Sequence, residues 1–99
     1  MDLKNEIERR TSEITNEITA VRHAIHEHPE LGFEEVETAA RVVSILEKLE
    51  IPHKTKIGGT GVVGVIEGGA PGPTVAIRSD MDALPMIEAS GVSFASKVP

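Results

Sequence analysis

The sequence contains no cysteine, so this chain of 99 residues can form neither a disulfide framework nor a thiolate metal site by itself. Aromatic residues are nearly absent: Phe33 and Phe94 are the only two, and a hydrophobic core must therefore be aliphatic. No apolar run approaches the roughly 20 residues that cross a bilayer. Residues 1–6 are too polar for a signal peptide. From these absences we expect a cytoplasmic protein without a membrane segment.

Positive charge is also in short supply. With 16 acidic and 10 basic side chains the net charge is −6, which argues against nucleic acid or an anionic membrane surface as a partner. The hydrophobic content of 39% and the charged content of 26% are ordinary for a globular chain. A chain of this length forms one small domain, which buries roughly 60–65% of its unfolded surface.

The first half of the chain predicts two helices. Apolar residues recur at steps of three and four from Leu3 to Ile25, which predicts an amphipathic helix that ends near His28, before Pro29. We expect its apolar face to pack on a sheet. A second helix is predicted from about residue 35 to residue 50, with a wide apolar stripe. In the loop between them, Gly32 is predicted to supply a backbone angle that other residues avoid.

Short strands are predicted in the second half. Residues 53–57 and 62–67 are expected to pair as a hairpin around a glycine-rich turn, and residues 68–73 break the pattern. Residues 74–78 then predict a third strand that is apolar on both faces, as central strands are, yet no segment remains to flank it. The order α-α-β-β-β does not complete a layer. We therefore expect the front part of a larger α/β domain.

Two aspartates follow the third predicted strand. Asp80 and Asp82 share a face of an extended segment, with Cα atoms roughly 6.5–7 Å apart, and functional crevices of α/β sheets lie beyond such strand ends. Carboxylates placed in this way surround a cation, accept hydrogen bonds from a ligand, or raise one another's pKa. The alternative is that one caps a turn and the other is solvated. The apolar residues 83–85 favour a site, because they would hold the two carboxylates against apolar neighbours and not in open solvent. Arg78 is expected to form a structural ion pair with either carboxylate.

Two further motifs, a dinucleotide-binding pattern and a possible metal site, have simpler explanations. Residues 59–64 match the G-x-G-x-x-G dinucleotide pattern, but no helix is predicted after them, so a hairpin turn is favoured. His23 and His26 could share a metal ion with Glu27 or Glu30. Solvated histidines at a helix end are favoured over that metal site, because no converging set of ligands is evident.

Four stretches together resemble a known enzyme family. They are His28-Pro29-Glu30-Leu31-Gly32-Phe33-Glu34-Glu35, Thr38-Ala39-Ala40, Gly59-Thr60-Gly61-Val62-Val63 and Arg78-Ser79-Asp80-Met81-Asp82-Ala83-Leu84-Pro85. In this order they are similar to the metal-dependent amidohydrolases related to hippurate hydrolase. That group includes the indole-3-acetyl-amino-acid hydrolases and the N-acyl-amino-acid deacylases, within the wider aminoacylase and carboxypeptidase G family. The resemblance implies that residues 1–99 are the N-terminal part of a three-layer, zinc-exopeptidase-like catalytic domain with a mixed sheet, without the lid and dimerisation domain.

The activity implied by the resemblance is hydrolysis of the amide bond of an N-acyl amino acid. In that family two divalent ions, zinc or manganese, activate a water molecule, and a glutamate acts as general base. Asp82 matches the aspartate that orients the metal ligands, and we assign it as catalytic. Asp80 stands where relatives keep a ligand histidine; in the hippurate hydrolase branch this substitution is usual and a later cysteine supplies a ligand. Asp80 and Arg78 are assigned supporting roles around the site.

The chain departs from the family pattern by lacking the later Cys-Gly-His-Asp stretch and the later histidine ligands. We therefore expect it to be inactive alone and to hold no metal ion more tightly than any pair of surface aspartates would. The full enzyme would act on a small N-acyl amino acid and could be homo-oligomeric. The alternative is a small self-contained binding module that pairs through its first helix without catalysis.

Overall fold

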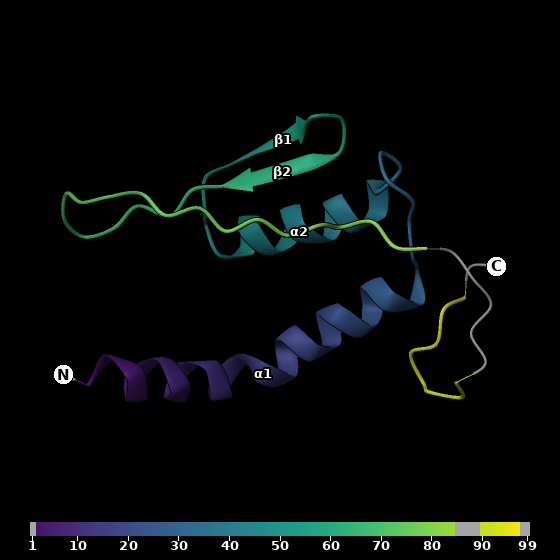
Figure 1. Cartoon of the computed structure of the whole chain (residues 1–99), viewed down its shortest axis with the longest axis horizontal. Coiled ribbons are helices and arrows are strands. Elements are labelled where there is room, and N and C mark those ends of the chain that lie inside the picture. The colour runs from purple at the N-terminus through teal and green to yellow at the C-terminus, as the bar shows by residue number, and fades with distance from the viewer. Residues whose placement is uncertain (1, 85–89, 98–99) are drawn as a thin grey trace. The chain divides into compact units, whose positions relative to one another are not determined.

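The computed structural model describes residues 2–84 and 90–97. Four regular elements follow one another: α1 (Leu3–Glu27), α2 (Val36–Lys48), β1 (His53–Ile57) and β2 (Gly61–Gly64) (Figure 1). The chain divides into two compact units. One comprises residues 1–29 and 85–99 and contains α1; the other comprises residues 30–84 and contains α2 and the two strands. Within the described residues, no helix combines the length and apolar character of a membrane span.

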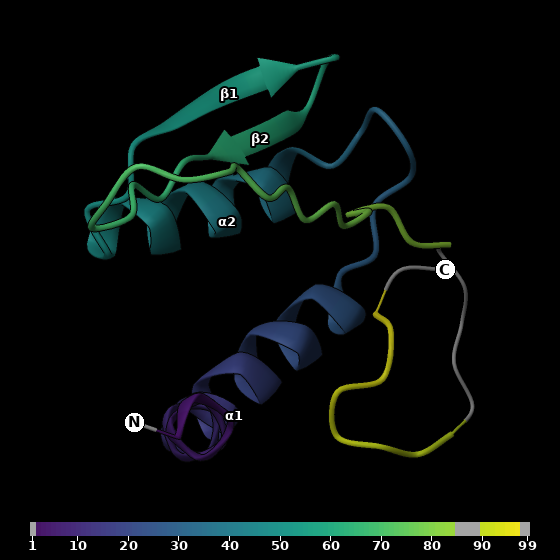
Figure 2. The same ribbon diagram turned by 60° about the vertical axis from the view of Figure 1, so that its left-hand side comes forward.

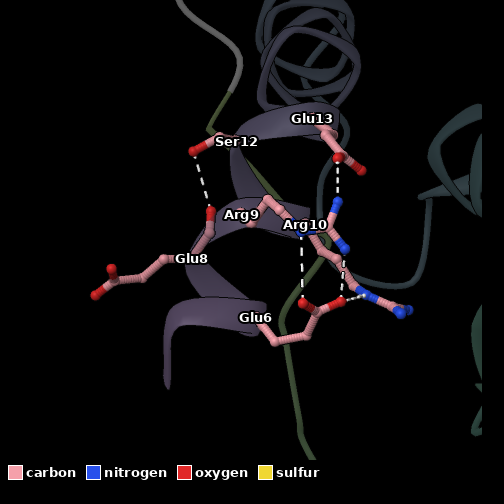
Figure 3. Close-up of polar contacts among 6 residues, drawn as sticks. All are labelled: Glu6, Glu8, Arg9, Arg10, Ser12 and Glu13. Atoms are coloured by element: carbon pink, nitrogen blue, oxygen red, sulfur yellow. Dashed lines mark hydrogen bonds and ion pairs between the residues drawn. The ribbon is translucent and has the colours of Figure 1, made fainter. Parts of the chain in front are cut away.

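Helix α1 has the extent that its periodicity predicted. Asp2 caps its start by accepting a hydrogen bond from the backbone N–H of Asn5 at 3.3 Å. Its first turns carry an ion-pair network in which Glu6 accepts from Arg9 at 2.6 Å and from Arg10 at 2.7 Å (Figure 3). These pairs lie three and four residues apart, where helical side chains meet. The helix ends at His28, before Pro29.

The apolar face of α1 is exposed, so the predicted packing of this face on a sheet does not occur within its own unit. Its exposed members are Leu3 (64%), Ile7 (56%), Ile14 (48%) and Ile18 (59%). No residue of the helix is buried. The physical reason lies in the unit itself, since the part of it that the structure describes contains no strand. Periodicity had predicted the face correctly but could not supply its partner.

In the second unit, α2 packs on the hairpin of β1 and β2, which lies along one side of the helix in both views (Figures 1 and 2). Leu46 and Ile51 cover Gly64, where an added Cβ would lie 3.3 Å from Leu46 Cδ2. Half-buried residues of the helix form its contact stripe: Ala39, Val42, Val43 and Leu46. At the margins of the predicted stripe, Val36 and Leu49 are 65% and 60% exposed. No apolar side chain among the described residues is fully buried.

Strands β1 and β2 form the predicted antiparallel hairpin. His53 pairs with Gly64, and Ile57 pairs with Gly61 across the turn. Gly58 and Gly59 supply the positive φ angles of the turn, +62° and +114°. The second strand ends at Gly64, three residues before the predicted end. An irregularity between residues 54 and 57 includes a positive φ of 57° at Lys56.

The predicted third strand is not formed. Residues 74–78 have no regular structure, and Val75 and Ile77 are 84% and 94% exposed. A strand exists only through hydrogen bonds to a neighbour, and the described part of the chain offers this segment none. The order is therefore α-α-β-β, a partial α/β domain, not α-α-β-β-β. Pro85, which was predicted to end that strand, lies outside the described residues.

Candidate functional site

The carboxylate of Glu30 caps the start of α2 from a distance in sequence. Its Oε1 accepts hydrogen bonds from the backbone N–H and the hydroxyl of Thr38, both at 2.6 Å, and its Oε2 accepts from the N–H of Glu37 at 3.0 Å. The first N–H groups of a helix have no partner within the helix, and a carboxylate there also gains from the helix dipole. Because Thr38 is only 2% exposed, water cannot easily replace these bonds.

These contacts change the acidity of Glu30. Burial alone would raise the pKa of its carboxyl group. The hydrogen bonds donated by the hydroxyl and backbone of Thr38, with those of Glu37 and Val36, outweigh burial and hold the pKa below its ordinary value. Glu30 therefore remains a carboxylate, which can accept all of these bonds, at neutral pH.

Glu35 precedes α2 and is buried, with 6% of its surface exposed. Its Oε2 accepts a hydrogen bond from the hydroxyl of Thr60, which lies 25 residues further along the chain in the turn between β1 and β2. This bond joins the start of α2 to the hairpin turn. A buried carboxylate without such a partner would carry a large desolvation cost.

Asp80 and Asp82 lie in an open groove of about 490 Å³ within the second unit. The segment that carries them runs alongside α2 in both views (Figures 1 and 2). One side of the groove is formed by residues 78–82. The other residues that line it come from the loop before α2 and from the hairpin turn with its flanking strand ends: Gly32, Phe33, Glu35, Ile57, Gly58, Thr60 and Gly61. The two aspartates thus lie in a groove, although the strand beyond whose end the crevice was predicted is not formed. Both aspartates are exposed, however, so apolar neighbours do not enclose them as expected.

The aspartate segment is held by two polar contacts. Arg78 Nη2 lies 2.9 Å from Asp80 Oδ1, which is the kind of ion pair that the sequence predicted for this arginine. Both side chains are well exposed, so the pair adds little to stability. The N–H of Ala83 donates to the carbonyl oxygen of Glu30 at 2.8 Å, directly after Asp82.

The residues of the groove do not by themselves fit a metal centre. Among the described residues, no group of three or more His, Cys, Asp or Glu side chains converges on one point. Asp80 is engaged by Arg78, and Glu35 is engaged by Thr60. A dinuclear site would need ligands beyond those that this chain brings together.

The two further motifs have structural explanations. Residues 61–64 form β2 and no helix starts after the glycines, so the dinucleotide hypothesis is wrong. His23 stacks on Phe94 with ring centroids 3.6 Å apart, and His26 meets the edge of the same ring at 5.4 Å. His23 is thus packed against an aromatic ring and not simply solvated, and neither histidine belongs to a metal-binding cluster within residues 2–84 and 90–97.

The sequence reading missed the roles of Glu30 and Glu35. Glu30 lies in a loop, as predicted, but its capping role went unrecognised because a cap from outside the helix leaves no periodic signal. The sequence reading also assigned the unusual backbone angle to the wrong residue: the positive φ, 66°, belongs to Phe33 and not to Gly32. The signal that could have found Glu30 is its place in the stretch from His28 to Glu35, which contributes to the family resemblance.

Comparison with solved structures identifies the class of protein that this fold resembles. The chain is similar to the YXEP protein of Bacillus subtilis, a dinuclear metal-binding peptidase of the M20 family. The TM-score is 0.78 at 41% sequence identity, over 88% of this chain and 24% of that protein. No family model matches the chain.

Curated relatives agree with this class. They include the thermostable carboxypeptidase 2 of Saccharolobus solfataricus (46% identity, 99% of this chain, 25% of the relative). The N-acyl-L-amino acid amidohydrolase of Geobacillus stearothermophilus is 43% identical over 97% of this chain and 26% of its own length. The hippurate hydrolase of Campylobacter jejuni is 41% identical over 86% of this chain and 22% of its own length. The chain is therefore related in sequence to the amidohydrolases and M20 peptidases, as the motifs predicted, and it spans about a quarter of the length of these relatives.

Proposed function

We propose that this chain forms the N-terminal part of the catalytic domain of an amidohydrolase that cleaves the amide bond of N-acyl amino acids. The observation that carries the proposal is the similarity, at 43% and 41% identity, to enzymes named for acyl amino acid and hippurate hydrolysis. The groove supports it, because Asp80 and Asp82, which lie in the stretch that resembles this family, both line it.

In this proposal Asp82 orients the metal-binding side chains, and Asp80 lies beside it in the groove. The ion pair with Arg78 lies on the exposed side of the segment and engages one oxygen of Asp80. The two divalent ions, zinc or manganese, would lower the pKa of a bound water molecule and polarise the substrate carbonyl. Because the described residues do not assemble a ligand set, we assign no reaction step to this chain alone.

The test compares the 99-residue chain with a protein of family length that carries it. We expect the longer protein to hydrolyse hippurate or an N-acetyl amino acid, to lose activity with a chelator and to regain it with manganese or zinc. We expect no turnover from the 99-residue chain and no micromolar metal binding by calorimetry. Cleavage of unblocked peptides without cleavage of N-acyl amino acids, or micromolar binding by the short chain, would contradict the proposal.

An aspartate substitution sharpens the test. In the longer protein, Asp82→Asn is expected to lower kcat about 10–100-fold, the usual effect of losing a group that orients metal ligands. Asp2→Asn is the matched control, because it removes the same charge and asparagine caps a helix as well as aspartate does. Equal activities of the two variants would refute the role of Asp82.

A second candidate function is a binding module that pairs through α1. The exposed apolar face of that helix favours it, with Leu3 and Ile18 64% and 59% exposed. This alternative requires a monodisperse dimer that melts cooperatively, whereas the enzyme proposal requires poor stability of the short chain. Size-exclusion chromatography with light scattering, combined with thermal melting, separates the two.

A further inference from the structure

Two glutamates at the start of α2 reach two different segments of the second unit. Glu30 caps the helix through its side chain, while its carbonyl oxygen accepts the N–H of Ala83 at 2.8 Å. Glu35 accepts the hydroxyl of Thr60 in the hairpin turn. Both connections join segments that are far apart in sequence, and both start from the loop of residues 30–35 that precedes α2.

The connected segments are the two sides of the groove. Residues 78–82 form one side, and the next residue, Ala83, is hydrogen-bonded to the carbonyl oxygen of Glu30. Thr60 lines the other side of the groove. Glu35 also lines the groove, but its carboxylate is buried and hydrogen-bonded. Glu30 does not line it. Glu30 can therefore influence the contents of the groove only through the segment that it holds.

We propose that Glu30 and Glu35 are positioning residues that set the distance between the hairpin turn and the Asp80–Asp82 segment. Glu30 fixes the aspartate side by anchoring the backbone after Asp82, and Glu35 fixes the hairpin side through Thr60. The catalytic consequence of this positioning rests on the proposed function. Its structural consequence does not.

Hydrogen exchange of the Ala83 amide, measured in the protein of family length that carries this chain, tests the structural part. We expect this amide to be protected at least about 10-fold in the wild type, because it is hydrogen-bonded to Glu30. Glu30→Ala is expected to abolish most of that protection. Glu34→Ala, which removes an exposed glutamate from the same loop, is expected to leave it unchanged. An unprotected Ala83 amide in the wild type, or equal protection in the two variants, overturns the proposal.

Kinetics of the family-length protein test the catalytic part. We expect Glu30→Ala and Glu35→Ala to lower kcat about 10–100-fold, as for other groups that orient an active site, with KM changed less than about threefold. Glu30→Gln should recover part of the loss, because its amide oxygen still accepts from Thr38, and it serves as the second variant if Glu30→Ala does not fold. The effects of Thr60→Val and Glu35→Ala on kcat should not add in the double variant, because both substitutions remove the same hydrogen bond.

The outcomes separate the two proposals. A wild-type protein without amidohydrolase activity refutes the proposed function, and the exchange experiment then still decides whether Glu30 positions the aspartate segment. An active wild type in which Glu30→Ala matches Glu34→Ala in kcat refutes the positioning role alone. A change confined to KM also refutes it, because it would show that Glu30 affects binding and not the arrangement of the reacting groups.

Discussion

Replacing Gly61 with alanine is a direct test of the turn that forms one side of the groove. A Cβ at this position would come closer to the carbonyl oxygen of Ile57 than real Cβ atoms approach any atom, and would lie 3.4 Å from the carbonyl carbon. The obstructing atom is backbone, and Ile57 is also the residue that pairs with Gly61 across the turn. The clash cannot be relieved by a side-chain rotation, so the end of the hairpin must open.

The size of the effect follows from the geometry. Inserting a methyl group into a packed site costs about 1–3 kcal/mol, and a backbone obstacle places Gly61→Ala at the upper end. About 3 kcal/mol corresponds to a roughly 100-fold larger opening equilibrium. Gly58→Ala meets no atom within 4 Å but has a φ of +62°, so it should cost only about 1–2 kcal/mol, the price of a left-handed backbone. Gly72→Ala meets neither obstacle and should be neutral or slightly stabilising.

Hydrogen exchange of the hairpin amides, measured in the protein of family length that carries this chain, gives these opening equilibria directly. Exchange should accelerate strongly in Gly61→Ala, moderately in Gly58→Ala and not at all in Gly72→Ala. If Gly61→Ala exchanged at the rate of Gly72→Ala, the turn could not have this geometry. The groove could then not have the shape described, because residues of this turn line one side of it.

Three further predictions concern single contacts. Because the pKa of Glu30 is lowered in the folded chain, its stabilisation of α2 should be complete above about pH 4.5, the ordinary glutamate range, and should be lost as the pH falls through the lower folded-state pKa. Amide exchange in α2, followed from about pH 7 to about pH 3, should show this loss of stabilisation. The variant Glu30→Gln should not show it. Hydrogen bonds from Arg9 and Arg10 lower the pKa of Glu6, so the helicity of the first turns of α1 should fall on acidification. Cα chemical shifts measure this helicity. It should also fall in about 0.5 M salt, because salt at that concentration screens ion pairs on the surface. Phe94→Ala should remove the ring-current shift from the His23 ring protons in the NMR spectrum and cost about 0.5–1.5 kcal/mol in that contact; unchanged His23 shifts would refute the stacking.

The local elements followed closely from the sequence. Helix α1 was predicted from Leu3 to near residue 28 and spans Leu3–Glu27; β1 has the predicted bounds. Helix α2 is shorter than predicted by a residue or two at each end. Each of these features depends on periodicity, proline and glycine within a few residues, and that information is contained in the local sequence.

The third strand was the main error in the fold. Val75 and Ile77 are residue types typical of a buried strand, but a strand forms only where a neighbouring strand is available for hydrogen bonding. In the structure these side chains are almost fully exposed and the segment has no ladder. The same applies to α1, whose apolar face was predicted correctly but meets no sheet among the described residues of its own unit.

At the site, the sequence alone predicted the resemblance to the amidohydrolases, proposed the carboxylates Asp80 and Asp82, and named the arginine that could pair with them. The tertiary structure decided which segments meet: Glu35 binds Thr60, and the carbonyl oxygen of Glu30 joins the loop before α2 to the backbone after Asp82. The physical reason is the range of the interactions. Helix and turn propensities act over a few neighbouring residues, whereas a hydrogen bond between residues 25 or more apart exists only once the chain has folded them together.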